Sequence, residues 1–186
     1  MYGLINSSLQ GMIRDKFGEA QWQAVLKESG VPEDSFLTMR SYDDKITYDL
    51  AGAAATVLGA PVEACLEMFG EYWVLETATK AYGPLMDAAG TDLVGFLENL
   101  NALHDRITGT FLNYVPPEFR VESLADGRHR IHYISQREGL TPFVVGLLKG
   151  LATHFDESID LHSVDQQVVS NGAHTVFVAT VGTDGR

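Results

Sequence analysis

The hydrophobic period of this chain changes once, and the change falls at the adjacent prolines Pro116 and Pro117. Before them, apolar residues recur at every third or fourth position, which is the spacing of amphipathic helices. After them, apolar residues alternate with polar ones, which is the spacing of half-buried strands. Two adjacent prolines also end any helix that reaches them. The sequence therefore predicts an α+β fold, in which a helical N-terminal part precedes a small antiparallel sheet with covering helices.

Glycine and proline divide the helical part into segments. The segment that restarts after Pro61 has Gly70 in its interior, where glycine costs about 1 kcal/mol relative to alanine, so a packing or functional reason is expected. Gly83-Pro84 predicts a further break between helices. The segments predicted as helices are 4–17, one through Trp22, Val25 and Leu26 that ends at Gly30, a third helix that continues over 51–58, 62–74, and one that runs from Thr91 or Asp92 to Phe111.

Two hairpin signals follow the prolines. Asp126-Gly127 and Asn171-Gly172 are dipeptides that favour tight turns between antiparallel strands. Between the two hairpins, residues 142–155 have helical spacing. This order favours a small antiparallel sheet with a helix on one face. The predicted strands are 119–123, 128–137, 159–164 and 175–181.

Charge and composition narrow the classes of function. The 186 residues contain 13 Lys and Arg against 25 Asp and Glu, and the net charge of −12 disfavours nucleic-acid and membrane-surface partners. No apolar run approaches the length of a membrane span, and the charged residues within the first thirty positions do not fit a signal peptide. The single cysteine, Cys65, excludes an intrachain disulfide and a cysteine-rich metal site. We therefore expect one cytoplasmic domain over residues 1–186, without membrane insertion.

His104 lies on the apolar stripe of the last helix before the prolines. It follows Leu100 by four residues and precedes Ile107 by three, so its side chain is expected to point inward with theirs. One interpretation is a core histidine whose ring is satisfied by a carbonyl group. The other is a metal or haem ligand, because a neutral imidazole in an apolar pocket can coordinate haem iron. The local sequence does not choose between them.

Three polar side chains share one face of the strand that follows the first hairpin. In an extended backbone Tyr133, Ser135 and Arg137 project together, and Ile131 continues the same face. A phenol, a hydroxyl and a guanidinium can together bind a carboxylate or a phosphate, for which arginine is well shaped. The alternative is a solvated outer face, against which the apolar Ile131 argues.

The spacing Tyr-x-Ser-x-Arg, as Tyr133, Ser135 and Arg137, resembles the haem-propionate-binding motif of the H-NOX family of haem nitric oxide/oxygen-binding domains. That family includes the haem domain of soluble guanylate cyclase. The resemblance covers nearly the whole chain and implies a haem buried between the helical part and the sheet. The other segments that carry it, in chain order, are Met1-Tyr2-Gly3-Leu4-Ile5-Asn6, Phe69-Gly70-Glu71-Tyr72-Trp73, Leu103-His104, Pro116-Pro117 and Gly146-Leu147-Leu148-Lys149-Gly150.

The resemblance implies that His104 is the proximal ligand of a b-type haem. The cysteine count agrees, because covalent haem attachment requires Cys-x-x-Cys-His and Cys65 is the only cysteine. It also implies that Tyr133, Ser135 and Arg137 bind the two propionates, whose negative charges suit a guanidinium and two hydroxyl donors.

The same resemblance assigns packing and hinge residues. Pro117, Ile5 and Leu100 would pack against the haem macrocycle. Gly70 would be a hinge between a helical subdomain at about residues 1–65 and a mixed α/β subdomain at about residues 66–186. A hinge would give the interior glycine its functional reason.

The distal side of the haem determines which gas binds. Bound dioxygen carries partial negative charge and needs a hydrogen-bond donor, whereas NO and CO need one far less. Oxygen-binding members of the family have a tyrosine three residues before the glycine of the Gly-Leu-Leu segment, and Phe143 stands there in this chain. Trp73 aligns with the other distal position, and its indole N–H could donate only if turned inward. An apolar wall of Trp73, Phe143 and Leu147 favours NO over O₂, although each of these side chains could equally be core packing.

The resemblance thus implies a haem-based sensor without enzymatic activity. NO, and also CO, would bind five-coordinate ferrous haem, and weakening or rupture of the bond between iron and His104 would carry the signal. Stand-alone bacterial relatives act through a histidine kinase or a cyclic-di-GMP enzyme, so such a partner is expected. Three alternatives stay open. They are an O₂ sensor or carrier of the same fold, a peroxidase-like haem enzyme, for which no distal acid–base residue is evident, and a haem-free interaction module.

Overall fold

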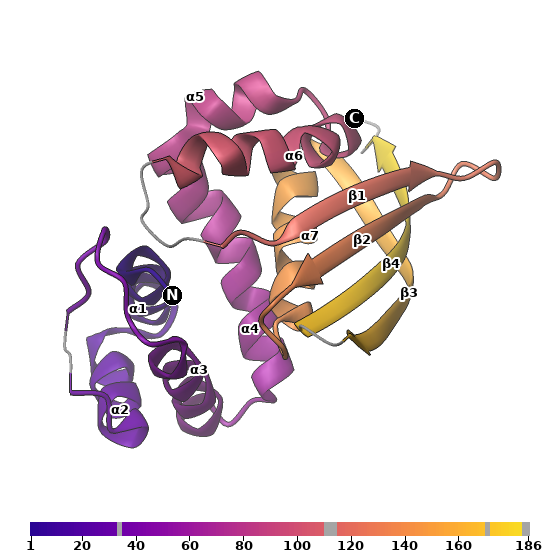
Figure 1. Ribbon diagram of the computed structural model, residues 1–186. Coiled ribbons are helices and arrows are strands. Elements are labelled where there is room, and N and C mark those ends of the chain that lie inside the picture. The colour runs from indigo at the N-terminus through magenta and orange to yellow at the C-terminus, as the bar shows by residue number, and fades with distance from the viewer. Residues whose placement is uncertain (33–34, 110–114, 170–171, 184–186) are drawn as a thin grey trace.

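The computed structural model describes residues 1–32, 35–109, 115–169 and 172–183. The helices of the first part precede the sheet, as the change of period at the prolines predicts (Figure 1). Three helices pack together at one end of the molecule, and a continuous helical stretch then leads toward the sheet. These elements are α1 (Gly3–Phe17), α2 (Glu19–Ser29), α3 (Asp44–Leu58), α4 (Val62–Tyr72), the π-helical η1 (Trp73–Ala78) and α5 (Thr79–Ala89).

The sheet has four antiparallel strands in the order β1-β2-β4-β3. α7 lies against one face of the curved sheet, and α6 lies beside β1 (Figure 1). Both predicted hairpins are present, although Asn171 itself lies outside the described residues. The elements are α6 (Leu93–Thr108), β1 (Glu118–Ser123), β2 (His129–Ser135), α7 (Thr141–His154), β3 (Glu157–Val169) and β4 (Gly172–Thr183).

β3 is an edge strand and is the longest strand of the sheet. Its pairing with β4 shifts register between Leu161 and Ser163, where an extra residue interrupts the ladder. Such a bulge bends the strand and increases its twist.

Among the described residues, two hydrophobic clusters form the interior. One joins α6, α7 and the inner face of the sheet and includes Leu93 and Phe177, which are fully buried. The other lies among the first three helices around Trp22. Phe143 packs against this second cluster, whereas the next residue, Val144, belongs to the first. The start of α7 therefore joins the two clusters.

α4 and α7 meet at a close contact that depends on two glycines. A Cβ atom on Gly70 would lie 2.1 Å from the carbonyl oxygen of Phe143, and one on Gly146 would lie 1.9 Å from the carbonyl oxygen of Glu67. Both separations are far below van der Waals contact, so only glycine fits at either position. The interior glycine of α4 therefore has a packing reason.

The helical stretch from α4 to α5 contains the π-helical turn η1 and continues through Pro84. The prediction of a break at Gly83-Pro84 is thus wrong. Pro84 and Lys80 are exposed, so water can hydrate the Lys80 carbonyl that lacks its helical donor.

Among the described residues no single helix is both long and apolar enough to cross a membrane. One pair of helical segments, Asp44–Leu58 and Val62–Ala89, has the length and composition of a span when the two are taken together, and the two are bent by 112° relative to each other.

Several helix limits also differ by a few residues from the predicted segments. α3 begins at Asp44, ahead of the part at 51–58 that the sequence indicates, because the Asp43 carboxylate accepts a hydrogen bond from the Lys45 backbone N–H and caps the helix there. α6 extends to Thr108, and Phe111, the last predicted member of its apolar stripe, lies outside the described residues.

Candidate functional site

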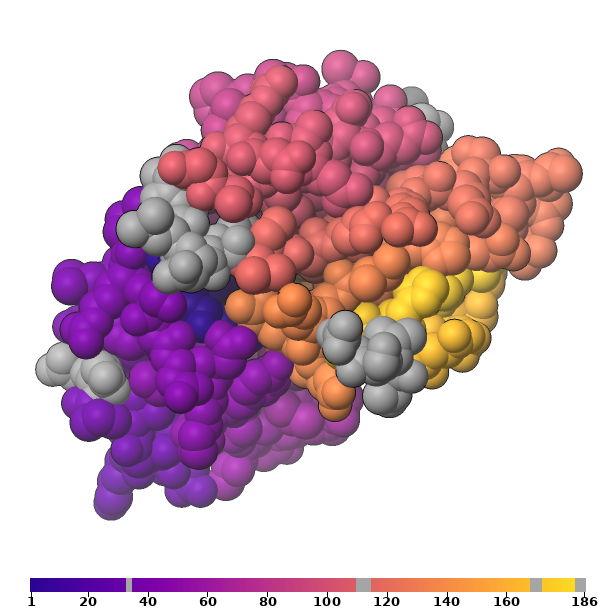
Figure 2. Space-filling view, viewed as in Figure 1, coloured from indigo at the N-terminus to yellow at the C-terminus, as the bar shows by residue number. Residues whose placement is uncertain are grey.

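A cavity of about 250 Å³ lies where the helical part meets the sheet. Its walls come from α1, η1, α5, α6, α7 and the first two strands, and most of its lining is apolar. Figure 2 shows the surface hollowed between the purple N-terminal helices and the orange segment after β2, with indigo N-terminal atoms at the bottom of the hollow. The predicted site residues that line the cavity are Ile5, Trp73, Leu100, His104, Pro117, Tyr133, Ser135, Arg137, Phe143 and Leu147.

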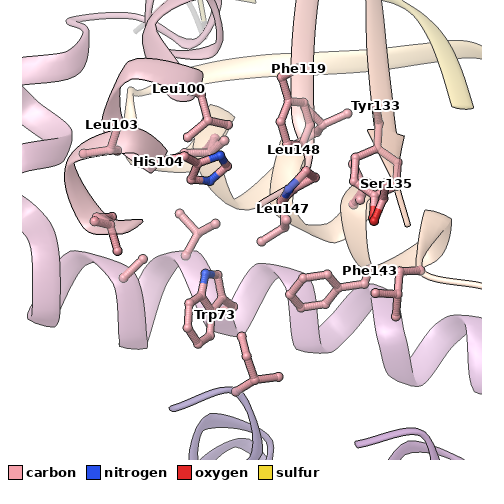
Figure 3. Close-up of a pocket in the computed structure, with 18 of the residues that line it drawn as sticks. Trp73, Leu100, Leu103, His104, Phe119, Tyr133, Ser135, Phe143, Leu147 and Leu148 are labelled. Carbon is pink, nitrogen blue, oxygen red and sulfur yellow. The ribbon is translucent and has the colours of Figure 1, made fainter. Parts of the chain in front are cut away.

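His104 enters the cavity from α6 (Figure 3). Leu100 and Leu103 of the same stripe are buried, which directs the imidazole inward as the helical spacing predicts. The buried Nδ1 of His104 makes no hydrogen bond of regular geometry within the described part of the chain. Burial lowers the pKa of the imidazole, and the nearby backbone of Pro117 and the charge of Asp105 offset this only in part. The ring is therefore a neutral imidazole at the wall of an apolar cavity, which is the form that binds a metal.

Tyr133 and Ser135 face the cavity from the inner side of β2. Ile131, Tyr133 and Ser135 are 1%, 3% and 7% exposed, so this side of the strand is not a solvated outer face. The backbone N–H of Arg137 donates to the hydroxyl of Ser135 over 3.1 Å. Burial raises the pKa of the Tyr133 phenol, although Ser135 and the charge of Arg137 lower it in part, so the phenol keeps its proton at neutral pH. Two hydroxyls and a cation therefore meet at the rim of an apolar cavity.

Arg137 is held by groups from two other parts of the chain. Its Nε donates to Oδ2 of Asp44 over 2.8 Å, and its Nη1 donates to the carbonyl oxygen of Val115 over 3.2 Å. Burial would raise the pKa of the Asp44 carboxyl, but the N-terminal ammonium of Met1 and the Arg137 guanidinium outweigh it and hold the pKa below its usual range. The carboxylate therefore stays ionised and fixes Arg137 at the rim.

Trp73, Phe143 and Leu147 form the cavity wall opposite His104 (Figure 3). Trp73 comes from the first position of η1, whereas Phe143 and Leu147 come from successive turns of α7. The indole nitrogen of Trp73 lies on the side of the ring that faces the cavity (Figure 3). The N–H of Trp73 is thus turned inward, which is the orientation that donation to a ligand in the cavity requires.

Gly70 does not line the cavity, and some residues that do were not singled out from the sequence. The hydrophobic period of the sequence does not identify Tyr82 as a cavity residue, because the wide turn of η1 shifts the helical phase before α5. Phe119 follows Pro117 by two residues, and its burial could be read from the alternation of β1. Asp44 reaches Arg137 from 93 positions away, and no local pattern indicates that pair.

These residues fit a haem. A porphyrin is a flat apolar ring with a central iron and two carboxylates at one edge. The cavity offers apolar walls, a neutral imidazole whose buried Nδ1 lacks a regular partner, and a cation with two hydroxyls at the rim. The fold and the site together define a class, that of α+β domains built to enclose a haem.

Comparison with known proteins narrows this class to one family. The model of the haem-NO-binding family, HNOB, matches residues 2–163. The chain therefore belongs to the haem-NO-binding, or H-NOX, family and is a haem-binding domain of that type.

The chain is similar to several curated and solved proteins. It is 32% identical over 165 residues to soluble guanylate cyclase gcy-32 of Caenorhabditis elegans, a match covering 87% of this chain and 24% of that protein. It is 28% identical over 196 residues to gcy-35 of the same organism, covering 97% of this chain and 27% of that protein. The chain thus spans about a quarter of the length of these curated relatives.

Solved structures share the fold. An H-NOX protein from S. oneidensis, solved in the Fe(II)NO ligation state, has a TM-score of 0.83 at 18% identity and covers 98% of this chain and 100% of its own. A mutant H-NOX protein from K. algicida, solved in the Fe(II) unliganded state, also has a TM-score of 0.83 at 18% identity and covers 99% of this chain and 98% of its own. The predicted α+β architecture is confirmed.

Proposed function

We propose that this domain is a nitric oxide sensor that holds a b-type haem and signals to a separate partner protein. One observation carries the proposal. The neutral imidazole of His104 faces, across an apolar cavity, a wall in which Phe143 stands where a tyrosine would favour O₂. Trp73 offers this wall a single indole donor, and Phe143 and Leu147 are apolar. Such a wall suits NO and CO, which need little hydrogen bonding.

Each of the predicted residues that line the cavity has a defined task in this proposal. A bound haem would supply an iron that can bind a diatomic gas. His104 presents its imidazole from α6, and Tyr133, Ser135 and Arg137 bind the propionates. Ile5, Leu100 and Pro117 pack against the macrocycle and exclude water from the cavity. With one cysteine in the chain, the haem is held without covalent attachment.

We further propose that the signal is a movement of α6. If the hold on His104 were weakened on gas binding, the helix would lose an anchor inside the cavity and would shift against Pro117. The helical part at about residues 1–65 and the mixed part at about residues 66–186 then move relative to each other near Gly70. Two states that differ in these contacts can bias the activity of a partner, for which a cytoplasmic histidine kinase or cyclic-di-GMP enzyme is our candidate. The domain has no catalytic task of its own.

Absorption spectra of the reduced protein test the sensor proposal. We expect a five-coordinate ferrous spectrum for the unligated protein, distinct complexes with NO and CO, and no persistent oxygen complex in air. A stable spectrum of the O₂ complex would instead support the alternative function, an O₂ sensor or carrier. The inward indole nitrogen of Trp73 is the observation that favours this alternative.

A variant of the proposed ligand tests the site. His104→Gly should take up less haem and change its spectrum, and free imidazole should restore both. Equal haem uptake and an unchanged spectrum without imidazole would contradict the assignment of His104.

A further inference from the structure

Asn101 ties α6 directly to the first strand of the sheet. Its Nδ2 donates to the carbonyl oxygen of Phe119 over 2.7 Å, and its Oδ1 accepts from the backbone N–H of Phe119 over 2.9 Å. A side-chain amide that pairs with both polar groups of one residue imitates a neighbouring strand. The two hydrogen bonds fix one turn of α6 to β1 in both distance and orientation.

This clamp joins two walls of the cavity. Asn101 precedes His104 by three residues on the same helix, so both side chains lie on one side of α6. Phe119 follows Pro117 by two residues at the start of β1, and its ring lies against those of His104 and Tyr133, with centroids 6.5 and 5.4 Å away. The clamp therefore sets the position of the imidazole relative to the proline wall and the tyrosine of the rim.

Among the described residues, the hydrogen bonds of regular geometry that tie α6 to other elements all lie before His104. At the first turn, the Leu93 backbone N–H donates to Glu157 of β3 over 2.7 Å, and just before the clamp Asn99 donates to the Ala89 carbonyl oxygen of α5 over 2.9 Å. The Asn101 clamp lies two turns after Leu93. Among described residues beyond Asn101, no α6 side chain makes a hydrogen bond of regular geometry to another element. The Thr108 hydroxyl donates within the helix, to the carbonyl oxygen of His104. In the described part of the chain, the last two turns meet the rest of the fold through the apolar packing of Leu103 and Ile107 and through the approach of the His104 ring to the Pro117 backbone.

From this distribution of anchors we infer that Asn101 is a positioning residue that holds α6 at the sheet while only the helix beyond it moves. The inference rests on the proposed sensing function. While the clamp holds, the imidazole of His104 is kept close to β1 and resists being drawn toward the opposite wall. Without the clamp, α6 can follow the haem, and the pull on His104 is relieved. Asn101 thereby favours release of His104 when NO binds.

The matched control lies on the same helix. The Nδ2 of Asn99 donates to the carbonyl oxygens of Ala89 and Gly95 over 2.9 and 3.0 Å, so it also bonds backbone, but it does not touch the sheet. Asn101→Ala and Asn99→Ala each remove one side-chain amide from α6. A loss of helix stability would appear in both variants, whereas an effect of the contact with β1 would appear only in Asn101→Ala.

Resonance Raman spectra of the reduced, haem-loaded protein without gas provide the first measurement. We expect the stretching band of the bond between iron and His104 to move to higher frequency in Asn101→Ala and to stay in place in Asn99→Ala. In the NO complex, the ratio of the six- to the five-coordinate form should rise about tenfold in Asn101→Ala, a change equivalent to about 1.4 kcal/mol. An unchanged band and ratio, or equal changes in both variants, would overturn the inference.

A second variant keeps the test decisive if Asn101→Ala does not fold. In Asn101→Asp the carboxylate still accepts from the Phe119 N–H but cannot donate to the Phe119 carbonyl, so an intermediate shift is expected. A band at the wild-type position in Asn101→Asp would then overturn the inference. A failure of the proposed sensing function can be told apart from a failure of this inference. A wild-type protein that binds no NO still has an iron–His104 band, and the effect of Asn101 on that band can still be measured.

Discussion

At the scale of single residues, the cavity is built from side chains that face each other across it from different elements. His104 is placed by helical spacing, and Tyr133 and Ser135 are placed by strand alternation. Both kinds of placement follow from the local sequence, because an apolar stripe or an alternating strand has one side that must be buried. The pairing of Arg137 with Asp44 could not be predicted, because it depends on how α3 approaches the end of β2.

Trp73 provides a test at this scale. If its inward N–H donates to a gas bound in the cavity, Trp73→Phe should raise the C–O stretching frequency of the CO complex, because a donor near the ligand oxygen weakens the C–O bond. Infrared spectra of the two CO complexes measure the shift.

Trp22→Phe is the control for that experiment. Trp22 has an unpartnered, buried indole N–H, and it lies in the cluster of the first three helices, away from the cavity. This variant should leave the C–O frequency unchanged. If Trp73→Phe gives the same frequency as the wild type, the indole does not reach the ligand.

At the scale of elements, the contact between α4 and α7 decides where the distal wall lies. Gly70 and Gly146 let the two backbones approach, and the rings of Phe69 and Phe143 pack beside this contact with centroids 4.9 Å apart. Trp73 follows Gly70 by three residues, so the contact also sets the position of the indole. The sequence marked Gly70 as unusual, but its packing reason required the structure, because the partner helix comes 73 positions later.

Substitution of Gly70 tests the packing reason. Gly70→Ala should lower the free energy of unfolding by about 1–3 kcal/mol, since the new Cβ would meet the Phe143 carbonyl oxygen at 2.1 Å. Urea unfolding followed by circular dichroism measures the change. A residue that served only as a hinge would show no such loss.

Gly52→Ala is the matched control for that substitution. Gly52 also lies inside a helix, but no atom lies within 4 Å of the position that a Cβ atom would take there, so alanine should stabilise the protein by about 0.5–1 kcal/mol. Equal effects of the two substitutions would show that the contact between α4 and α7 tolerates a methyl group.

At the scale of the whole molecule, a few polar contacts link the first three helices to the rest. Asp44 pairs with Arg137, and the hydroxyl of Tyr48 donates to the Glu138 carbonyl oxygen over 2.9 Å, so α3 holds the segment after β2 at two points. The order of helices and strands followed from the change of period at the prolines. The way in which the two parts enclose a cavity did not, because it depends on contacts between residues far apart in sequence.

The link between Asp44 and Arg137 predicts a dependence of stability on pH. The pKa of Asp44 is held below its ordinary value of 3.8, so the folded state gains stability from the carboxylate above that pH and loses it as the pH falls through the lowered value. Asp44→Asn should therefore lower the free energy of unfolding at neutral pH. Since the carboxylate is 39% exposed, the loss should be no more than about 1 kcal/mol. Urea titrations at neutral pH and below 3.8 measure it.

Asp49→Asn serves as the control for the link between the two parts. Asp49 pairs with Lys45 on the same helix, so its loss should cost only about 0.3 kcal/mol at neutral pH. A difference between wild type and Asp44→Asn that does not shrink in acid would contradict the assignment of the lowered pKa to this carboxyl.

The register shift in β3 affects how copies of this protein meet at high concentration. An unpaired edge of this length would offer a row of backbone donors and acceptors to the edge of another molecule. The bulge between Leu161 and Ser163 interrupts that row, and the exposed Asp160 and Asp165 place like charges along it. Edge-to-edge aggregation of concentrated samples is thereby opposed by the shape of the strand and by its charge.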